Sequence, residues 1–113
     1  MRLAFDIDGT LTEPLPPWDW TKVTPAQYVE LYKSLKPNQE VISAVNCLYY
    51  QDIHDIWIWT SRDVYFAEVT EQWLRRNDVH YNRIFYNKLF VDILLDDKST
   101  SSLNELERML KRV

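Results

Sequence analysis

The sequence contains almost no glycine. Only Gly9 is present among 113 residues, whereas an average composition would supply about eight. Proline, asparagine and aspartate must therefore make most of the turns. We expect the single glycine to stand where a Cβ atom would crowd the turn or a neighbouring group.

Cysteine and long apolar runs are equally scarce. Cys47 is the only cysteine, so an internal disulfide is excluded. Because it falls within an apolar helical pattern, we expect a buried thiol. No apolar run approaches the roughly 20 residues that a membrane span requires, and no signal peptide precedes the first expected strand. The sequence therefore predicts a cytoplasmic protein with no membrane association.

The charge is mildly acidic, with a formal net value of −4. This balance disfavours general coating of nucleic acid, although a local basic patch would still allow nucleic acid as a partner. Hydrophobic residues make up 46% of the chain and aromatic residues 14%, which is enough for one core. We expect one domain over residues 1–113, with Trp57, Trp59 and Trp73 in its core.

Short apolar runs alternate with helical patterns along the chain. Strands are predicted at Arg2 to Phe5, Ile53 to Trp59, Arg83 to Tyr86 and Val91 to Leu95. Helices are predicted from Thr24-Pro25 to about Leu35, from near Asn38, from about Val64 to Asn77, and after a cap at Thr100 or Ser101. This alternation predicts an α/β domain with a mainly parallel sheet.

Polar residues follow several of the predicted strands. They are Asp6 and Asp8, then Thr60, Ser61 and Arg62, then Asp96 and Asp97. Ligands bind beyond the carboxyl ends of parallel strands, and carboxylates gathered there repel one another unless a cation such as Mg²⁺ lies among them. One aspartate could attack phosphorus while the other handles a proton, with a hydroxyl and an ammonium holding the phosphoryl oxygens. A single aspartate at a strand end is most often only a turn or cap residue.

The stretch FDIDGTLT, residues 5–12, resembles the first motif of the haloacid dehalogenase-like superfamily, most of whose members are Mg²⁺-dependent phosphatases. The other family motifs follow in order as Thr60, Lys88 and the pair Asp96-Asp97. The resemblance spans Leu3 to Asp97 and implies a Rossmann-like three-layer sandwich around a mainly parallel sheet.

The resemblance also implies roles for single residues. Asp6 would be the nucleophile that forms an aspartyl-phosphate, and Asp8 the general acid and later base. Thr60 and Lys88 would hold the phosphoryl group. Further phosphate contacts would come from Gly9, Thr10, Ser61 and Arg62, and Mg²⁺ would be bound by Asp6, Asp8 and Asp97, with Asp96 in support.

Two basic residues leave alternatives open. Lys98 is a rival to Lys88, which lies in Asn87-Lys88-Leu89 where many relatives carry Gly-Lys-Pro. Arg62 is either an additional phosphate contact or the partner of Asp63 or Glu68 in a salt bridge.

The stretch from Trp59 to Ser99 is similar to a small capless branch of the superfamily. That branch contains capsule-biosynthesis-type phosphatases, polynucleotide kinase phosphatase domains and deoxyribonucleotidase-like proteins. An insertion at about 13–36 has room for a loop and one short helix, so no full cap domain is expected. The open site would admit bulky substrates, or a second copy of the chain would close it. The aromatic residues of the insertion either form a partial lid or only pack on the core; they are Trp18, Trp20, Tyr28 and Tyr32.

The leading hypothesis is a Mg²⁺-dependent phosphomonoester hydrolase that acts on a small phosphorylated metabolite such as a nucleotide or a sugar phosphate. One alternative is a phosphatase that processes nucleic-acid ends, which the capless form favours and the acidic charge disfavours. A non-enzymatic phospho-acceptor would carry its acidic pair before the acceptor aspartate, which is the reverse of the order here. A degenerate family member is disfavoured because Asp6, Asp8, Thr60, Lys88 and Asp97 are all present.

Overall fold

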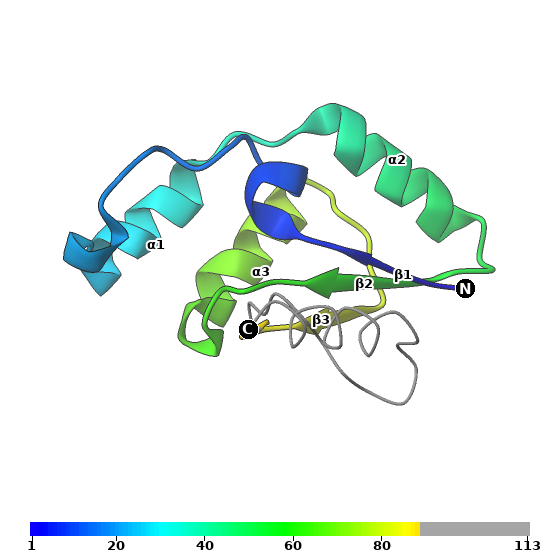
Figure 1. Ribbon diagram of the computed structural model, residues 1–113. Helices are drawn as coiled ribbons and strands as arrows, with labels where there is room; N and C mark the ends of the chain where they lie inside the picture. The colour runs from blue at the N-terminus through cyan, green and yellow to red at the C-terminus, as the bar shows by residue number, and fades with distance from the viewer. Residues whose placement is uncertain (89–113) are drawn as a thin grey trace, which may run out of the picture.

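The computed structural model describes residues 1–88 of the chain. Figure 1 shows the elements in the order β1 (Arg2–Phe5), α1 (Pro25–Ser34), α2 (Gln39–Tyr50), β2 (Asp55–Trp59), α3 (Ala67–Arg76) and β3 (Arg83–Phe85). The strands form one parallel sheet in the order β1-β2-β3. This architecture confirms the predicted α/β class and is a small Rossmann-like fold. The strand predicted at Val91 to Leu95 and the last helix fall outside the described residues.

One face of the sheet carries the main core. The register pairs Phe5 with Ile58 and Ile58 with Ile84, so these side chains point to the same face. Fully buried Ile58 packs there in one cluster with Val45 of α2 and Trp73 of α3. Both helices therefore share a core with the same sheet face. The predicted third layer concerns residues beyond 88 and stays a prediction.

The other face of β2 and β3 is aromatic. Trp57 of β2 lies 4.9 Å from Phe85 of β3 between ring centroids. Trp59 is 47% exposed, so its assignment to the core was wrong. Trp73 is 1% exposed, which confirms that it belongs to the core. Strand alternation explains the difference, because Trp59 points away from the face that α2 and α3 cover.

Local sequence signals set the helix starts. Thr24 and Gln27 form a reciprocal capping box, with Thr24 N donating to Gln27 Oε1 at 2.8 Å and Gln27 N to Thr24 Oγ1 at 3.2 Å. Asn38 caps α2 by accepting a hydrogen bond from Val41 N at 3.4 Å. The predicted starts of these helices are confirmed.

Several element boundaries differ from the prediction, and β3, for example, ends at Phe85 rather than Tyr86. Strand β2 begins at Asp55 rather than Ile53, and Ile53 is 70% exposed. Before α3, Val64–Phe66 forms a separate 3₁₀ turn. The side chain of Asp63 stabilises this turn by accepting a hydrogen bond from Tyr65 N at 2.8 Å.

Turns without glycine use aspartate and asparagine, as predicted. Asp52, Asp78 and Asn87 have φ values of 57°, 56° and 57°, in the left-handed region that these residue types tolerate. Cys47, in contrast, is exposed on α2, so the prediction of a buried thiol was wrong. The buried stripe of α2 contains Ile42 and Val45, and Cys47 lies about 140° around the helix from Ile42.

The insertion packs against α3 in a second cluster. Leu31, Tyr32 and Leu35 bury their side chains there with Val69 of α3. Trp73 Nε1 donates a hydrogen bond of 2.8 Å to the Leu35 carbonyl oxygen, which ties the end of α1 to the main core. These contacts fix α1 beside the carboxyl end of the sheet.

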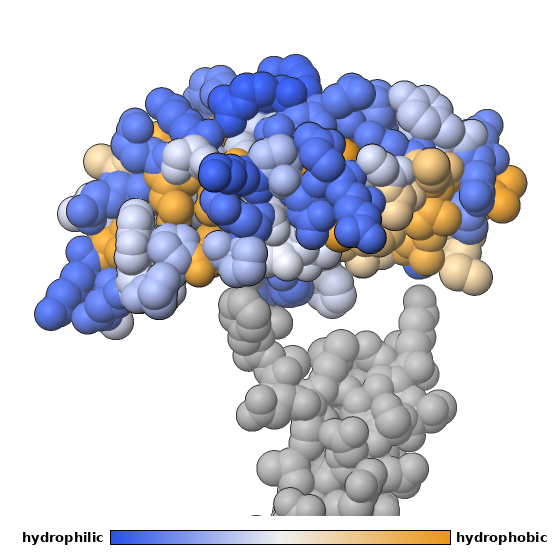
Figure 2. Space-filling model, turned by 90° about the horizontal axis from the view of Figure 1, so that it is seen from above, coloured by the Kyte–Doolittle hydropathy of each residue, from blue (hydrophilic) through white to orange (hydrophobic). Residues whose placement is uncertain are grey.

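The polarity of the outer surface is consistent with the burial of apolar side chains in these two clusters. Figure 2 shows a face that is mostly hydrophilic and is interrupted by apolar patches. Within residues 1–88, no helix combines the length and the apolar character that crossing a membrane demands.

Candidate active site

The motif at residues 5–12 forms the sharp turn that follows β1. Asp6 retains an extended backbone, and the chain then turns through Ile7–Leu11. Ile7 and Leu11 are fully buried and anchor the turn in the core. The turn is closed by hydrogen bonds from Thr12 N to the Ile7 carbonyl oxygen at 3.0 Å and from Gly9 N to Thr12 Oγ1 at 3.1 Å. Asp6 and Asp8 therefore project from a backbone that the core holds in place.

The backbone conformation at position 9 favours glycine over other residues. Its φ is +78°, in the left-handed region that costs other residues about 1–2 kcal/mol. A Cβ atom added to Gly9 would have no heavy atom of the described structure within 4 Å. The expectation that a Cβ would crowd the turn was therefore wrong, and the left-handed conformation supplies the reason for glycine. The expectation that a Cβ would crowd a bound metal or phosphoryl group stays a prediction.

Asp6 is brought next to Lys88. Lys88 Nζ lies 3.4 Å from Asp6 Oδ2, while Asp6 Oδ1 accepts a 2.8 Å hydrogen bond from Ile7 N. The ammonium also lies 5.7 Å from the centroid of the Trp59 ring. A carboxylate from the end of β1 thus faces a cation that follows β3.

Backbone hydrogen bonds hold Lys88 in this position. Lys88 N donates to the Thr60 carbonyl oxygen and Asn87 N to the Arg62 carbonyl oxygen, both at 2.9 Å. Asn87 adopts the left-handed conformation, with φ of 57°. It thereby makes a left-handed turn of the kind that glycine otherwise favours.

Asp8 has a different partner, the guanidinium of Arg62. Arg62 Nε donates to Asp8 Oδ2 at 3.1 Å and Nη2 to Asp8 Oδ1 at 2.6 Å. The two side chains are 1% and 14% exposed, respectively. The salt-bridge alternative for Arg62 was therefore right in kind but wrong in partner, because Asp8 takes the place expected for Asp63 or Glu68. Its role as a phosphate contact stays a prediction.

Arg62 is itself held from two further sides. Its Nη1 donates to Thr70 Oγ1 at 3.0 Å, and its guanidinium carbon lies 3.7 Å from the centroid of the Tyr32 ring. Burial raises the pKa of Tyr32 to about 12, even though the charge of Arg62 acts in the opposite direction. Tyr32 is therefore neutral at physiological pH and offers its ring face to the cation.

The remaining predicted phosphate contacts lie around these pairs. Thr60 is fully buried, and its Oγ1 accepts a 3.1 Å hydrogen bond from Arg62 N. Ser61 lines a cleft together with Asp8. Thr10 is half-buried within the turn that contains Gly9. All of these residues occupy the loops at the carboxyl ends of β1 and β2.

The described residues supply part of the expected metal site. Within residues 1–88, no group of three or more His, Cys, Asp and Glu side chains is arranged to hold a metal ion. Asp96, Asp97 and the rival Lys98 lie outside the described residues. Both carboxylate oxygens of Asp8 are bonded to Arg62, so its main-chain carbonyl oxygen is the donor that Asp8 can offer beside the Asp6 carboxylate. Such an all-oxygen set suits Mg²⁺.

The sequence reasoning missed the contacts of Arg62 with Asp8, Thr70 and Tyr32. A signal was present, because Arg62 follows β2 directly and the ends of neighbouring parallel strands meet at one edge. An arginine there needs an acidic partner if it is buried, and Asp6 and Asp8 are the acidic residues that follow the adjacent strand.

Comparisons with known proteins bear on the fold alone. No family model and no curated protein matches the chain. A crystal structure of a structural-genomics target from Vibrio cholerae is similar, with a TM-score of 0.54 and 21% sequence identity. The match covers 98% of this chain and 97% of that one. At this level of identity, the similarity shows that the two chains share a fold.

Proposed function

We propose that the chain is a Mg²⁺-dependent phosphomonoester hydrolase that works through an aspartyl-phosphate on a small phosphorylated metabolite. The observation that carries this proposal is the 3.4 Å approach of Lys88 Nζ to Asp6 Oδ2 at the carboxyl edge of a parallel sheet. A carboxylate beside a fixed cation suits nucleophilic attack on a phosphoryl group, because the cation offsets the charge that gathers on the phosphoryl oxygens.

The first step of the proposed reaction transfers the phosphoryl group to Asp6. An Asp6 carboxylate oxygen attacks phosphorus, and the bond from phosphorus to the leaving-group oxygen breaks. In this step the Asp8 carboxyl group is protonated and turns one oxygen away from Arg62, and it donates its proton to the leaving-group oxygen, so the leaving group departs as a neutral alcohol. Lys88 and the hydroxyl of Thr60 hold the phosphoryl oxygens during the transfer.

The second step releases phosphate. Asp8, now a carboxylate, takes a proton from a water molecule, and the water oxygen attacks phosphorus. The bond between phosphorus and Asp6 breaks, so inorganic phosphate leaves and both carboxyl groups return to their starting forms. The ion pair with Arg62 orients the Asp8 carboxylate for this step, which makes Arg62 a positioning residue.

The proposed Mg²⁺ would be held by the Asp6 carboxylate and the main-chain carbonyl oxygen of Asp8, with Asp97 as the third expected ligand. When bound, Mg²⁺ neutralises negative charge on the phosphoryl oxygens. The need for such a cation follows from the charges, since Asp6 must approach a phosphoryl group that is itself an anion.

The experiment is a phosphate-release assay of the full chain with and without Mg²⁺, on a generic phosphomonoester and a panel of nucleotides and sugar phosphates. We expect release that requires Mg²⁺ and is lost in Asp6→Asn. Asp52→Asn is the matched control, because Asp52 is exposed and its left-handed conformation suits asparagine equally. Absence of Mg²⁺-dependent release, or equal release by Asp6→Asn, would overturn the proposal.

A further inference from the structure

A cleft of about 460 Å³ opens beside Asp8. Polar and aromatic side chains both line it, namely Asp8, Ser61, Arg62 and Asp63 together with Leu15, Trp20, Tyr28, Tyr32 and Phe66. We call this space the aromatic cleft. Its volume falls in the range of about 300–1,000 Å³ that is usual for small-molecule sites.

The rings of the aromatic cleft come from two separate segments. Trp20 and Tyr28 belong to the insertion and stack with their centroids 5.9 Å apart and their planes at 22°. Phe66 belongs to the 3₁₀ turn before α3, and its centroid lies 5.5 Å from that of Tyr28. All three side chains are half-buried, so they pack on the core between α1 and α3 and still present surface to the cleft. Trp20 and Tyr28 can therefore pack on the core and form part of a lid at the same time, so the two alternatives for the insertion do not exclude each other.

The position of Asp8 determines which part of a substrate would enter this cleft. In the proposed reaction Asp8 donates its proton to the leaving-group oxygen, so the leaving group must lie within hydrogen-bond reach of Asp8. The residues that line the cleft include Asp8 and do not include Asp6 or Lys88. The phosphoryl group would therefore lie toward the Asp6–Lys88 pair, and the leaving group would extend into the aromatic cleft.

We propose that the leaving group carries a planar aromatic ring of nucleobase size, which Trp20 and Tyr28 bind by stacking, so that the substrate is a nucleoside monophosphate. This inference rests on the proposed function, since it uses Asp8 as the acid. Aromatic side chains bind bases through their π-faces. A sugar phosphate without a base would leave these rings unused.

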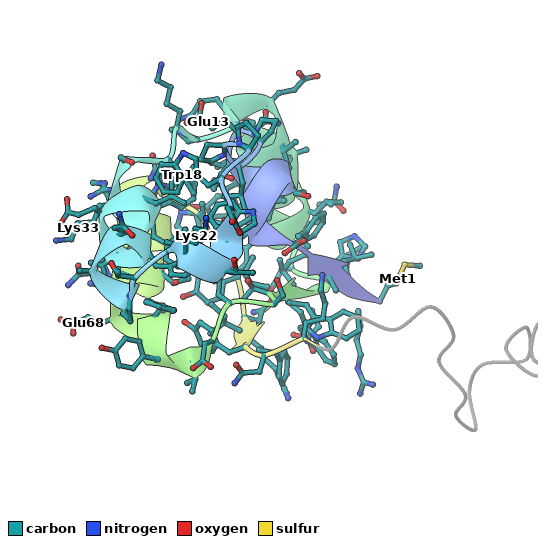
Figure 3. All side chains as sticks on the ribbon, turned by 60° about the vertical axis from the view of Figure 1, so that its left-hand side comes forward. Met1, Glu13, Trp18, Lys22, Lys33 and Glu68 are labelled. Atoms are coloured by element: carbon teal, nitrogen blue, oxygen red, sulfur yellow. The ribbon has the colours of Figure 1, made fainter. Side chains whose placement is uncertain are left out.

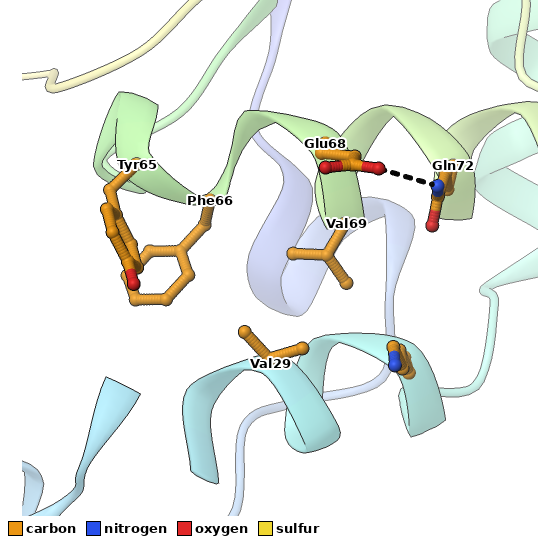
Figure 4. Close-up of a pocket in the computed structure, with 7 residues that line it drawn as sticks. Val29, Tyr65, Phe66, Glu68, Val69 and Gln72 are labelled. Carbon is orange, nitrogen blue, oxygen red and sulfur yellow. Dashed lines mark hydrogen bonds between the residues drawn. The ribbon is translucent and has the colours of Figure 1, made fainter. Parts of the chain in front are cut away.

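A second cavity, shown in Figure 4, is a less suitable site. It has a volume of about 330 Å³ and lies between α1 and α3, where Val29 and Val69 face each other and Glu68 bonds to Gln72. Asp6, Asp8, Thr60 and Lys88 are not among the residues that line it, so a ligand there would lie away from these reacting groups. Phe66 lines both cavities, and we therefore choose Trp20 for the test.

The test compares adenosine 5′-monophosphate with ribose 5-phosphate, which is the same phosphomonoester without the base. We expect kcat/KM for the nucleotide to exceed that for ribose 5-phosphate by tenfold or more, and Trp20→Leu to reduce this ratio about tenfold. Trp18→Leu is the matched control, because Trp18 (labelled in Figure 3) does not line the cleft, although its ring lies 5.8 Å from that of Trp20 between centroids. We expect it to leave the ratio unchanged. Equal kcat/KM for the two compounds, or an unchanged ratio in Trp20→Leu, would overturn the inference.

A binding measurement separates failure of this inference from failure of the proposed function. Calorimetric titration of the full chain with the same two compounds requires no turnover. If neither compound is hydrolysed but the nucleotide binds at least tenfold more tightly and Trp20→Leu removes that difference, the hydrolase proposal fails and the cleft assignment stands. If ribose 5-phosphate is hydrolysed and the base adds no affinity, the hydrolase proposal stands and the cleft assignment fails.

Discussion

The pair Asp8–Arg62 provides a prediction whose size follows from the structure. Arg62 forms two hydrogen bonds with Asp8, and its side chain is only 1% exposed. Removal of one partner from a buried ion pair costs about 3–5 kcal/mol, because the other charge stays buried without compensation. We expect Arg62→Met to lower the free energy of unfolding by about this amount, and Asp8→Asn to lower it by somewhat less, because Thr70 and Tyr32 still hold the guanidinium.

The assay is urea denaturation of the wild type, both single variants and the double variant Asp8→Asn/Arg62→Met. If the pair contributes as a unit, the double variant loses less stability than the two single variants together. We expect a coupling free energy of about 2–3 kcal/mol. Arg83→Met is the control, since Arg83 lies 3.9 Å from Asp55 and its side chain is 63% exposed, so a change below about 1 kcal/mol is expected. A coupling below about 0.5 kcal/mol would refute the reasoning.

Two further predictions concern the turn after β1 and the buried tyrosine beside it. Gly9→Ala should lower the free energy of unfolding by about 1–2 kcal/mol through backbone strain, measured by denaturation, although the added Cβ meets no described atom within 4 Å; unchanged stability would contradict this. Burial raises the pKa of Tyr32 to about 12 in the folded chain, whereas a tyrosine of the unfolded chain has a pKa of about 10. The protonated phenol therefore contributes its full stabilisation below pH ~10 and loses it as the pH rises through 12. The free energy of unfolding should change by about 3 kcal/mol over this interval. The stability difference between the wild type and Tyr32→Phe should therefore fall over that interval in denaturation experiments at several pH values, and a constant difference would show that the phenol does not stay protonated in the fold.

Local signals made much of the fold predictable. The apolar run Arg2 to Phe5, the cap at Thr24 and the cap at Asn38 each act within a few residues, so the sequence pattern and the structure agree. The approach of Asp6 to Lys88 was also predictable, because residues that follow parallel strands meet at one edge of the sheet. In these cases the physical cause lies within the segment or in a general rule of sheet topology.

The errors concern long-range packing. Arg62 and Asp8 are 54 residues apart, and no local pattern distinguishes Asp8 from Asp63 as a partner. Trp59 is aromatic like Trp73, but only the cover on each sheet face decides which of them is buried. Cys47 fits an apolar stretch, yet the buried stripe of α2 is defined by its contact with the sheet. Gly9 was recognised as a special position, whereas its reason, a left-handed turn with open space beside it, required coordinates.

The most direct test of the central claim is detection of phosphate on Asp6 during turnover. The full chain would be mixed with Mg²⁺ and a phosphomonoester that it hydrolyses, quenched in acid and digested, and its peptides examined by mass spectrometry. The account predicts an acid-stable, alkali-labile phosphate on the peptide that contains Asp6, and none on that peptide in Asp6→Asn. Turnover with no such adduct, or with phosphate on a different residue, would contradict it.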